Sequence, residues 1–338
     1  MKVRSIELIP FRGTTVTKLT ADNGQLGWGE CPQPLTRTQE QELNQVQGWE
    51  PTAYEVMRTR LLAHPAQGAI NMALLDLAGK AVKAPVYQLL GGATRNKVRA
   101  MVAVTGDAGK SLDSLQRNGH RAFSISTGSA EGARANFVAG VRDRLAAWKK
   151  AAGDGCDFVV DGSGALAPAE AQQVSSAVEK LHPLWFDEPC ALTNLAAARK
   201  LAEENVTPLG WGRNITSLAT VQDLLREQMC DVVRLDIGTH GISSIRKAAA
   251  LAETYYVAVA PYHVGGPIAT AAAIQLAASL PNFFIQQMPQ PPSDDWHERR
   301  AEIAGSDIEK VTDGYLSIPA GPGLGIEVNE SALRRYAQ

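Results

Sequence analysis

Hydrophobic and polar positions change their rhythm along the chain. From Met1 to about Glu30, apolar and polar residues alternate as they do in strands, with a turn at Asp22–Gly24. This opening predicts two strands joined as a hairpin. The segment 69–84 then reads AINMALLDLAGKAVKA and places apolar residues at helical spacing on one face, before Pro85. A helix is therefore expected over this segment.

From Lys97 onward, eight short apolar runs alternate with helical windows. The runs read VRAMVAV, AFSIST, DFVVDGSG, LWFDEP, TPLGWGRN, DVVRLDIG, YVAVAPYH and NFFIQQMP. Thr216 or Ser217 is expected to start one of the helices between them, and Pro168 lies at the beginning of another. Strands that alternate with helices indicate parallel βα units, and eight of them favour a closed barrel over an open sheet.

Composition narrows the class of protein. The chain has 338 residues, 45% of them hydrophobic, which suffices for a sizeable core. Its 33 basic and 35 acidic residues give a net charge of -2, and neither sign forms a long block. This balance favours a small-molecule partner over nucleic acid or an acidic membrane. The start lacks a signal sequence and no apolar run reaches about 18 residues, so a cytoplasmic protein is expected.

The four cysteines give no sign of a disulfide framework or a zinc site. They are Cys31, Cys156, Cys190 and Cys230, and no two of them form a CxxC pair. Reduced, mostly buried thiols are expected.

Polar residues stand where the predicted strands end. In a βα barrel, functional groups lie at the carboxyl ends of the strands, around a common mouth. A polar residue at one strand end is usually a cap or a turn former, but a polar residue at almost every end indicates a site. In order from the second strand to the eighth, these residues are Ser124 and Ser126, Asp161, Glu188, Arg213 and Asn214, Asp236, His263, and Gln287.

Several motifs, in order, resemble one enzyme group. They are AINMALLDLAGKAVKAPVYQLLGG, VVDGSG with FDEP after the next helix, LDIGTHGISSIRKAAALAE, APYHVGGPIATAAAIQLAASLPNFFIQ and GPGLGIEV. Together they are similar to the mandelate racemase and muconate lactonizing enzyme group of the enolase superfamily. Within that group, APYHVGGPIATAA followed by PNFFIQ looks like the galactonate- and mannonate-type acid-sugar dehydratases.

The resemblance implies a fold of class α/β, a (β/α)7β TIM-like barrel with an α+β capping domain. Residues 1–92 would form the N-terminal part of the cap and residues 93–317 the barrel. Residues 318–338 would return to the cap. The resemblance also implies a homo-oligomer.

The resemblance further implies chemistry that removes the proton α to a carboxylate, with Mg2+ held by three carboxylates. By position, Asp161 and Glu188 match two metal ligands, but the third place, in Gly212-Arg213-Asn214, holds Arg213. Mg2+ is normally held by negative charge, so impaired metal binding is expected. Arg213 is expected to fork across Asp161 and Glu188. Alternatively it turns to solvent and leaves a weak site of Asp161, Glu188 and Asn214.

Two further departures concern proton transfer. The family usually carries Lys-x-Lys on the second strand, and this chain has Ser124-Ile125-Ser126; a serine is not an unassisted general base near neutral pH. Gln287 stands where relatives commonly place Glu. His263 and Asp236 remain, and adjacent strands should bring them together as an acid–base pair.

Three functions follow from these expectations. The first is a dehydratase-type lyase that acts on a small hydroxy-carboxylate or sugar acid through His263 and Asp236, without Mg2+ or another cofactor. In it, the substrate would meet Arg213, Asn214, Ser124, Ser126 and Gln287. The second is a catalytically degenerate protein that binds a carboxylate or serves in an assembly. The third is a weakly Mg2+-dependent dehydratase that uses Asn214.

Overall fold

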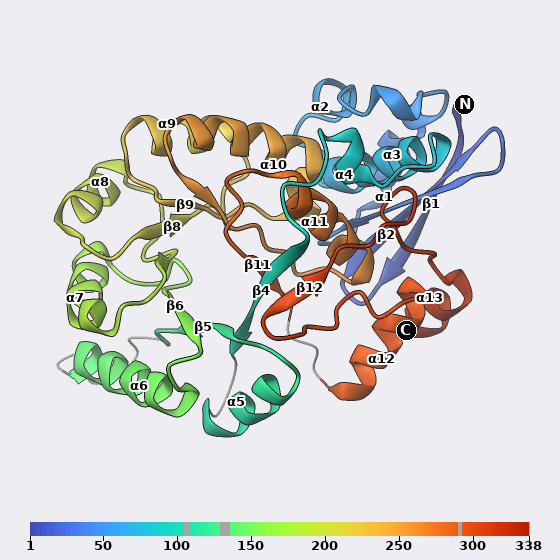
Figure 1. Cartoon of the computed structure of the whole chain (residues 1–338). Helices are drawn as coiled ribbons and strands as arrows, with labels where there is room; N and C mark the ends of the chain where they lie inside the picture. Colours follow the sequence, from blue (N-terminus) through green and yellow to red (C-terminus); the bar gives the residue numbers. More distant parts are fainter. Residues whose placement is uncertain (105–107, 129–135, 290–292, 338) are drawn as a thin grey trace.

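The first strands form an antiparallel sheet at the N-terminal end of the chain (Figure 1). The computed structural model describes residues 1–104, 108–128, 136–289 and 293–337. The sheet consists of β1 (Val3–Phe11), β2 (Thr14–Ala21) and β3 (Leu26–Cys31). Arg12 and Gly13 both have positive φ and turn the chain inside the segment expected to be one strand. The predicted two-stranded hairpin is therefore a three-stranded meander.

Helix α3 (Gln67–Ala81) packs on this sheet. It lies where the helix was expected, but every residue from Gly68 to Gly79 is buried, so the single apolar face is corrected to a helix covered on all sides. A Cβ on Gly29 of β3 would lie 1.9 Å from the carbonyl oxygen of Ala69, which is why this crossing needs glycine. The shorter helices nearby are α1 (Arg37–Glu42), η1 (Leu43–Val46), η2 (Pro51–Ala53), α2 (Met57–Arg60) and α4 (Val86–Leu89).

The second sheet is parallel and curls into a barrel. Its strands are β4 (Lys97–Val104), β5 (Ala122–Ser126), β6 (Asp157–Asp161), β7 (Phe186–Asp187), β8 (Leu209–Trp211), β9 (Val232–Val233), β10 (Ala258–Val259) and β11 (Gln286–Met288). The sheet runs in the order β10, β9, β8, β7, β6, β5, β4, β11. Single bridges between Val259 and Phe283, and between Tyr262 and Gln287, join its two edges. The predicted eight strands and the barrel are confirmed.

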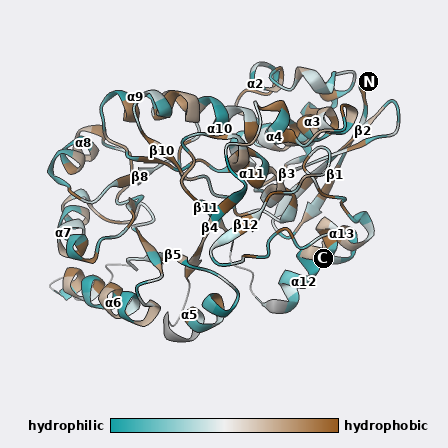
Figure 2. Cartoon of the chain, in the orientation of Figure 1, coloured by the Kyte–Doolittle hydropathy of each residue, from teal (hydrophilic) through white to brown (hydrophobic). Residues whose placement is uncertain are grey.

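The helices between the strands form an outer layer around the barrel. They are α5 (Ala108–Arg117), α6 (Phe137–Ala152), α7 (Pro168–Val178) followed by η4 (Glu179–Leu181), α8 (Leu195–Glu204), α9 (Leu218–Arg226), α10 (Ile237–Thr254) and α11 (Pro267–Ser279). Figure 2 shows hydrophilic and hydrophobic residues mixed along α6 to α9, as expected for helices with one face in water. Ser217 caps α9, and Pro168 begins α7, as predicted.

The C-terminal segment returns to the first sheet. It contains α12 (Asp294–Ala304), β12 (Tyr315–Ser317), which pairs antiparallel with β4, and α13 (Glu330–Tyr336). Lys18 Nζ of β2 lies 2.6 Å from Glu330 Oε2, and Glu7 of β1 pairs with Arg334. These ion pairs place α13 beside β1 and β2 (Figure 1). In the described part of the chain, no helix combines the length and apolarity that crossing a membrane requires.

A buried carboxylate on β3 connects the first sheet to the barrel. Glu30 Oε1 accepts hydrogen bonds from Gly266 N (2.5 Å) and Thr14 Oγ1 (3.1 Å), and Oε2 accepts one from Ala269 N (3.2 Å). Gly266 is the N-cap of α11, so the carboxylate satisfies free N–H groups at the positive end of that helix. Burial raises the pKa of Glu30, while the Gly266 N–H group opposes the rise.

Candidate functional site

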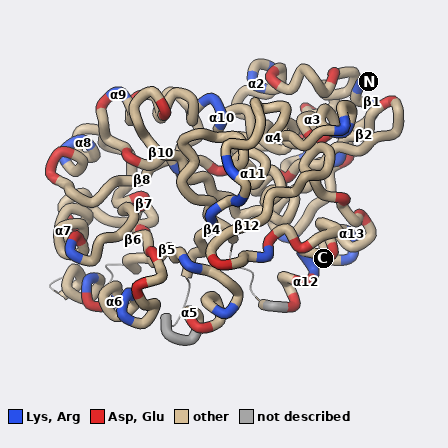
Figure 3. The backbone as a smooth tube through the Cα atoms, viewed as in Figure 1, with Lys and Arg blue, Asp and Glu red and all other residues tan. Residues whose placement is uncertain are grey.

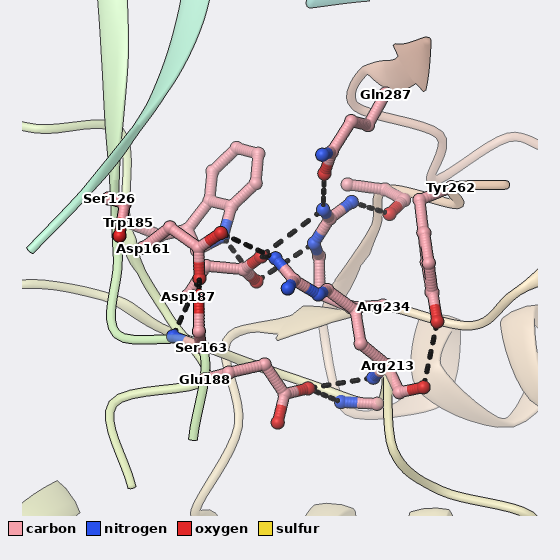
Figure 4. Close-up of polar contacts among 12 residues, drawn as sticks. Ser126, Asp161, Ser163, Trp185, Asp187, Glu188, Arg213, Arg234, Tyr262 and Gln287 are labelled. Atoms are coloured by element: carbon pink, nitrogen blue, oxygen red, sulfur yellow. Dashed lines mark hydrogen bonds and ion pairs between the residues drawn. The ribbon is translucent and has the colours of Figure 1, made fainter. Parts of the chain in front are cut away.

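The carboxyl ends of the strands meet at one end of the barrel, where strand register decides which side chains share a face. Ser126 is the register partner of Asp161, and Asp161 is the register partner of Asp187. On the far side, Tyr262 is bridged to Gln287. Register partners point to the same face of a parallel sheet. These five residues therefore surround the barrel mouth together (Figure 4).

Arg213 follows β8 and bridges the two carboxylates of the mouth. Its Nη1 lies 2.7 Å from Asp161 Oδ2 and 3.2 Å from Asp187 Oδ2. Its backbone oxygen accepts a hydrogen bond of 2.8 Å from the Tyr262 hydroxyl. Burial opposes the charge of Arg213, but Asp161 and then Asp187 outweigh it and raise its pKa. The expected contact with Asp161 is present, and the second carboxylate is Asp187 rather than Glu188.

Glu188 points away from the other carboxylates. Its φ of 42° is in the left-handed region, unusual for a residue with a side chain. Its Oε1 accepts hydrogen bonds of 2.7 Å from the backbone N–H groups of Gly212 and Arg213. Burial, and then the neighbouring Asp187, raise the pKa of Glu188. The expected pairing of Glu188 with the Arg213 guanidinium is wrong, because the Glu188 carboxylate binds the backbone N–H group of Arg213 instead of its side chain.

A second arginine lies beneath Arg213 and is fully buried. Arg234 follows β9, and its Nε and Nη2 lie 2.8 and 3.2 Å from Oδ1 and Oδ2 of Asp187. The guanidinium also donates to the Ala260 carbonyl oxygen and to Gln287 Oε1. Sequence reasoning missed this residue. The available signal was a lone arginine in the buried run DVVRLDIG, which requires an acidic partner.

Guanidinium groups and aromatic rings alternate along the barrel interior. Arg234 Cζ lies 5.3 Å from the centre of the Trp185 ring and 5.7 Å from that of Tyr262. Arg213 Cζ lies 5.7 Å from the Tyr262 ring. Cations are attracted to ring faces at such distances, more strongly where water is excluded. Trp185 also donates a hydrogen bond of 3.0 Å to Asp187 Oδ1. Trp185 and Arg234 therefore hold the Asp187 carboxylate from inside the barrel (Figure 4).

Gly210 on β8 makes room for this arrangement. A Cβ at Gly210 would lie 2.5 Å from Trp185 Cδ1 and 2.8 Å from Asp187 Oδ1. Both distances are too short for any side chain. The glycine of the run TPLGWGRN therefore allows the Trp185–Asp187 hydrogen bond to form inside the barrel.

His263 is turned away from the mouth. Its ring is buried, Nε2 lies 3.2 Å from Thr270 Oγ1, and Nδ1 has no hydrogen-bond partner among the described residues. Burial, and then the nearby Arg300, lower the pKa of His263 to about 3. The imidazole is therefore neutral and enclosed near pH 7.

Asp236 caps a helix instead of orienting His263. Its Oδ2 accepts hydrogen bonds from Thr239 N (2.8 Å) and Thr239 Oγ1 (2.6 Å) at the start of α10. Oδ1 has no hydrogen-bond partner within the described segments. The register partner of Asp236 is Tyr262, one residue before His263, so the strand turns the histidine to the other side. The expected contact between Asp236 and His263 is therefore corrected.

The other predicted residues lie at different depths. Ser124 is buried, with no hydrogen-bond partner for its Oγ among the described residues. Ser126 and Asn214 are exposed at the mouth, and Ser126 Oγ accepts a hydrogen bond of 3.0 Å from Gly128 N. Gln287 lies deeper and meets Arg234.

Acidic positions at the mouth outnumber basic ones by one. Figure 3 shows acidic positions at β6 and β7, and the full set of charges is Asp161, Asp187 and Glu188 against Arg213 and Arg234. Among the described residues, no group of three His, Cys, Asp or Glu side chains is arranged to hold a metal ion.

Two cavities lie away from the mouth. One of about 620 Å³ is between α2 and α10, and one of about 790 Å³ is between α5 and α12. The mouth is defined by its convergent side chains rather than by either cavity.

A parallel barrel with a small antiparallel sheet and carboxylates on adjacent strand ends defines the class of enolase-like barrels. Residues 107–332 match the family described as Enolase C-terminal domain-like. Residues 13–91 match the N-terminal domain of mandelate racemase and muconate lactonizing enzyme. The chain therefore belongs to the mandelate racemase and muconate lactonizing enzyme family of the enolase superfamily.

Relatives cover almost the whole chain. A D-galactonate dehydratase of Variovorax paradoxus is 29% identical over 94% of this chain and 89% of its own. A D-galactarolactone cycloisomerase of Agrobacterium fabrum is 28% identical over 96% and 91%. The crystal structure of an enolase of Agrobacterium radiobacter with bound Na and L-malate has a TM-score of 0.87 and 27% identity, covering 100% of this chain and 95% of that one. The chain is thus of the acid-sugar dehydratase-like type.

Proposed function

We propose that this protein is a metal-independent member of its family, which binds a small hydroxy-carboxylate or sugar acid at the barrel mouth without abstracting its α-proton. The observation that carries the proposal is the bridge from Arg213 Nη1 to Asp161 Oδ2 and Asp187 Oδ2. A resident guanidinium holds Asp161, which matches one of the family's metal ligands, together with the neighbouring carboxylate of Asp187.

Charge supports the metal-independent part of the proposal. At about 4 Å and an effective dielectric near 20, a unit charge pair interacts by about 4 kcal/mol, so a divalent ion beside a guanidinium meets a repulsion of about 8 kcal/mol. Mg2+ also requires near-octahedral oxygen ligands. Here Oδ2 of Asp161 and Oδ2 of Asp187 already accept hydrogen bonds from Arg213.

Unused donors on Arg213 support the binding part. Nη1 serves both carboxylates, while Nε and Nη2 form no hydrogen bond within the described residues, and the side chain is 20% exposed. The planar edge of a guanidinium matches a carboxylate or a pair of hydroxyls. The sugar acids named for the relatives carry both kinds of group.

The lyase hypothesis is less well supported than the binding hypothesis. It needs an accessible acid or base, and His263 is enclosed, with a pKa lowered to about 3 and no hydrogen bond to Asp236. Tyr262 faces the mouth in its place, but burial raises the Tyr262 pKa, which makes the phenol a poor base. The hypothesis of a metal site completed by Asn214 would require Arg213 to leave both carboxylates.

Metal analysis and deuterium exchange test the proposal together. Protein purified from cells grown with Mg2+ should contain far less than one metal ion per chain. In D2O, NMR of D-galactonate, D-gluconate and L-malate should show no exchange at the α-carbon. Near-stoichiometric Mg2+ or measurable exchange would contradict the proposal.

Calorimetric titration tests the ligand. One or more of the three acids should bind the wild type and fail to bind Arg213→Met. Arg199→Met, which removes an exposed arginine from α8, is the matched control and should bind like the wild type. Equal binding by Arg213→Met would place the ligand elsewhere.

A further inference from the structure

Arg234 holds the same carboxylate as Arg213 but from inside the barrel. Its side chain is completely buried, whereas that of Arg213 is 20% exposed. Both oxygens of Asp187 receive N–H groups from Arg234, at 2.8 and 3.2 Å. Asp187 therefore has a counter-ion that does not depend on Arg213.

We infer that Arg234 is a second resident cation of the site, which keeps divalent cations away from Asp161 and Asp187 even when Arg213 is replaced by an acid. This inference rests on the proposed metal independence and adds a second cause for it. Two residues would then prevent metal binding. Only Arg213 stands at a position where the family has a metal ligand, so the effect of Arg234 is not evident from those positions.

Arg234 lies close to any metal ion that Asp187 could bind. A divalent ion bound to a carboxylate oxygen lies about 2.1 Å from it. Because Asp187 Oδ2 is 3.2 Å from Arg234 Nη2, such an ion would lie at most about 5 Å from that nitrogen. In the buried interior this repulsion is weakly screened, and it lowers the affinity by orders of magnitude.

The Arg234 guanidinium is also confined by its neighbours. Arg234 is flanked by the Trp185 and Tyr262 rings and donates to the Ala260 carbonyl oxygen and Gln287. Moving the guanidinium aside would leave these acceptors unpaired in the interior, which is costly. The Arg213 side chain is 20% exposed at the mouth, whereas that of Arg234 is completely buried and has no path to solvent.

Mn2+ binding tests the inference, followed by electron paramagnetic resonance of free MnCl2 and by calorimetry. Arg213→Glu alone should bind Mn2+ no better than the wild type. Arg213→Glu with Arg234→Gln should bind at least about 100-fold more tightly than the single variant, which corresponds to about 2.7 kcal/mol. Arg213→Glu with Arg234→Lys is the matched control, because lysine keeps the charge without the planar fork, and it should not bind.

The outcomes separate the two proposals. Tight Mn2+ binding by Arg213→Glu alone would overturn the role of Arg234 and leave the proposed function standing. Tight binding by the wild type would overturn the proposed function itself. Circular dichroism and melting check that each variant is folded; if Arg234→Gln prevents folding, Arg234→Met takes its place. A folded double variant without Mn2+ affinity would also refute the inference.

Discussion

Replacing Asp187 with asparagine tests the buried charge network most directly. Asp187 is completely buried and accepts N–H groups from Arg213, Arg234 and Trp185. Asp187→Asn keeps the shape but removes the negative charge and leaves Arg234 buried with neutral acceptors only. Removing one partner of a buried ion pair costs about 3–5 kcal/mol.

The expected change in melting temperature follows from the size of the chain. Unfolding entropy is about 2.1 cal/mol/K per residue, or about 0.7 kcal/mol/K for 338 residues, so the loss corresponds to about 4–7 °C. Scanning calorimetry measures it. Trp185 fluorescence reports locally, because its indole N–H lies 3.0 Å from Asp187 Oδ1.

The control for this prediction lies on the neighbouring strand. Asp157→Asn makes the same change at the other end of β6, in an ion pair with Arg99 whose side chains are 48% and 27% exposed. Surface ion pairs contribute about 0–1 kcal/mol, so the control should melt within about 1.5 °C of the wild type. If Asp187→Asn melts as high as Asp157→Asn, the reasoning about the buried network is refuted.

Two more predictions concern groups outside the mouth. The pKa of His263 is lowered from 6.5 to about 3, so as pH falls below 6.5 the unfolded chain takes up a proton that the folded chain does not. Urea unfolding should therefore give a free energy of unfolding that is about 2 kcal/mol lower at pH 5 than at pH 7, and His263→Gln should abolish this difference. An unchanged pH dependence in that variant would contradict the lowered pKa of His263. Glu30→Gln should lower the free energy of unfolding by roughly 2 kcal/mol, because glutamine has one acceptor oxygen and leaves the N–H group of Gly266 or Ala269 without an acceptor. The exposed Glu50→Gln should change it little, and equal unfolding midpoints would argue against the capping role.

The barrel could be predicted because its evidence is distributed over the chain. Eight apolar runs, spaced by helical windows, each correspond to one strand from β4 to β11. An error in one run would not have changed the architecture. The first sheet was misjudged because the turn at Arg12 and Gly13 has one glycine as its only sequence signal, and an arginine at positive φ is not expected from sequence.

The strand ends that meet at the mouth were predicted, but the residue that faces the mouth was not always the expected one. At two strand ends the structure uses the residue before the expected one, Asp187 instead of Glu188 and Tyr262 instead of His263. Side chains alternate along a strand, so a shift of one position exchanges the inside for the outside. Parallel strands are apolar on both faces, and the runs at these two ends contain no alternation that would fix which residues face inward.

The remaining contacts of the site could not be predicted because they join residues that are far apart in the sequence. His263 contacts Thr270, whose hydroxyl in turn donates to Glu309 of the C-terminal segment. Arg234 finds Asp187 two strands away in the sheet. Nothing near either residue in the sequence indicates these partners, since they depend on how the barrel closes.

Glu30 has a consequence for building chimeric proteins from this family. The first N–H groups of α11, a helix of the barrel, donate to Glu30 on β3 of the antiparallel sheet. The two parts are therefore not interchangeable modules. A barrel grafted onto a foreign first sheet would inherit open donors at α11 unless the incoming third strand places an acid at the same depth. Recombination designs that exchange the sheet should therefore keep Glu30 together with its donors Gly266 and Ala269.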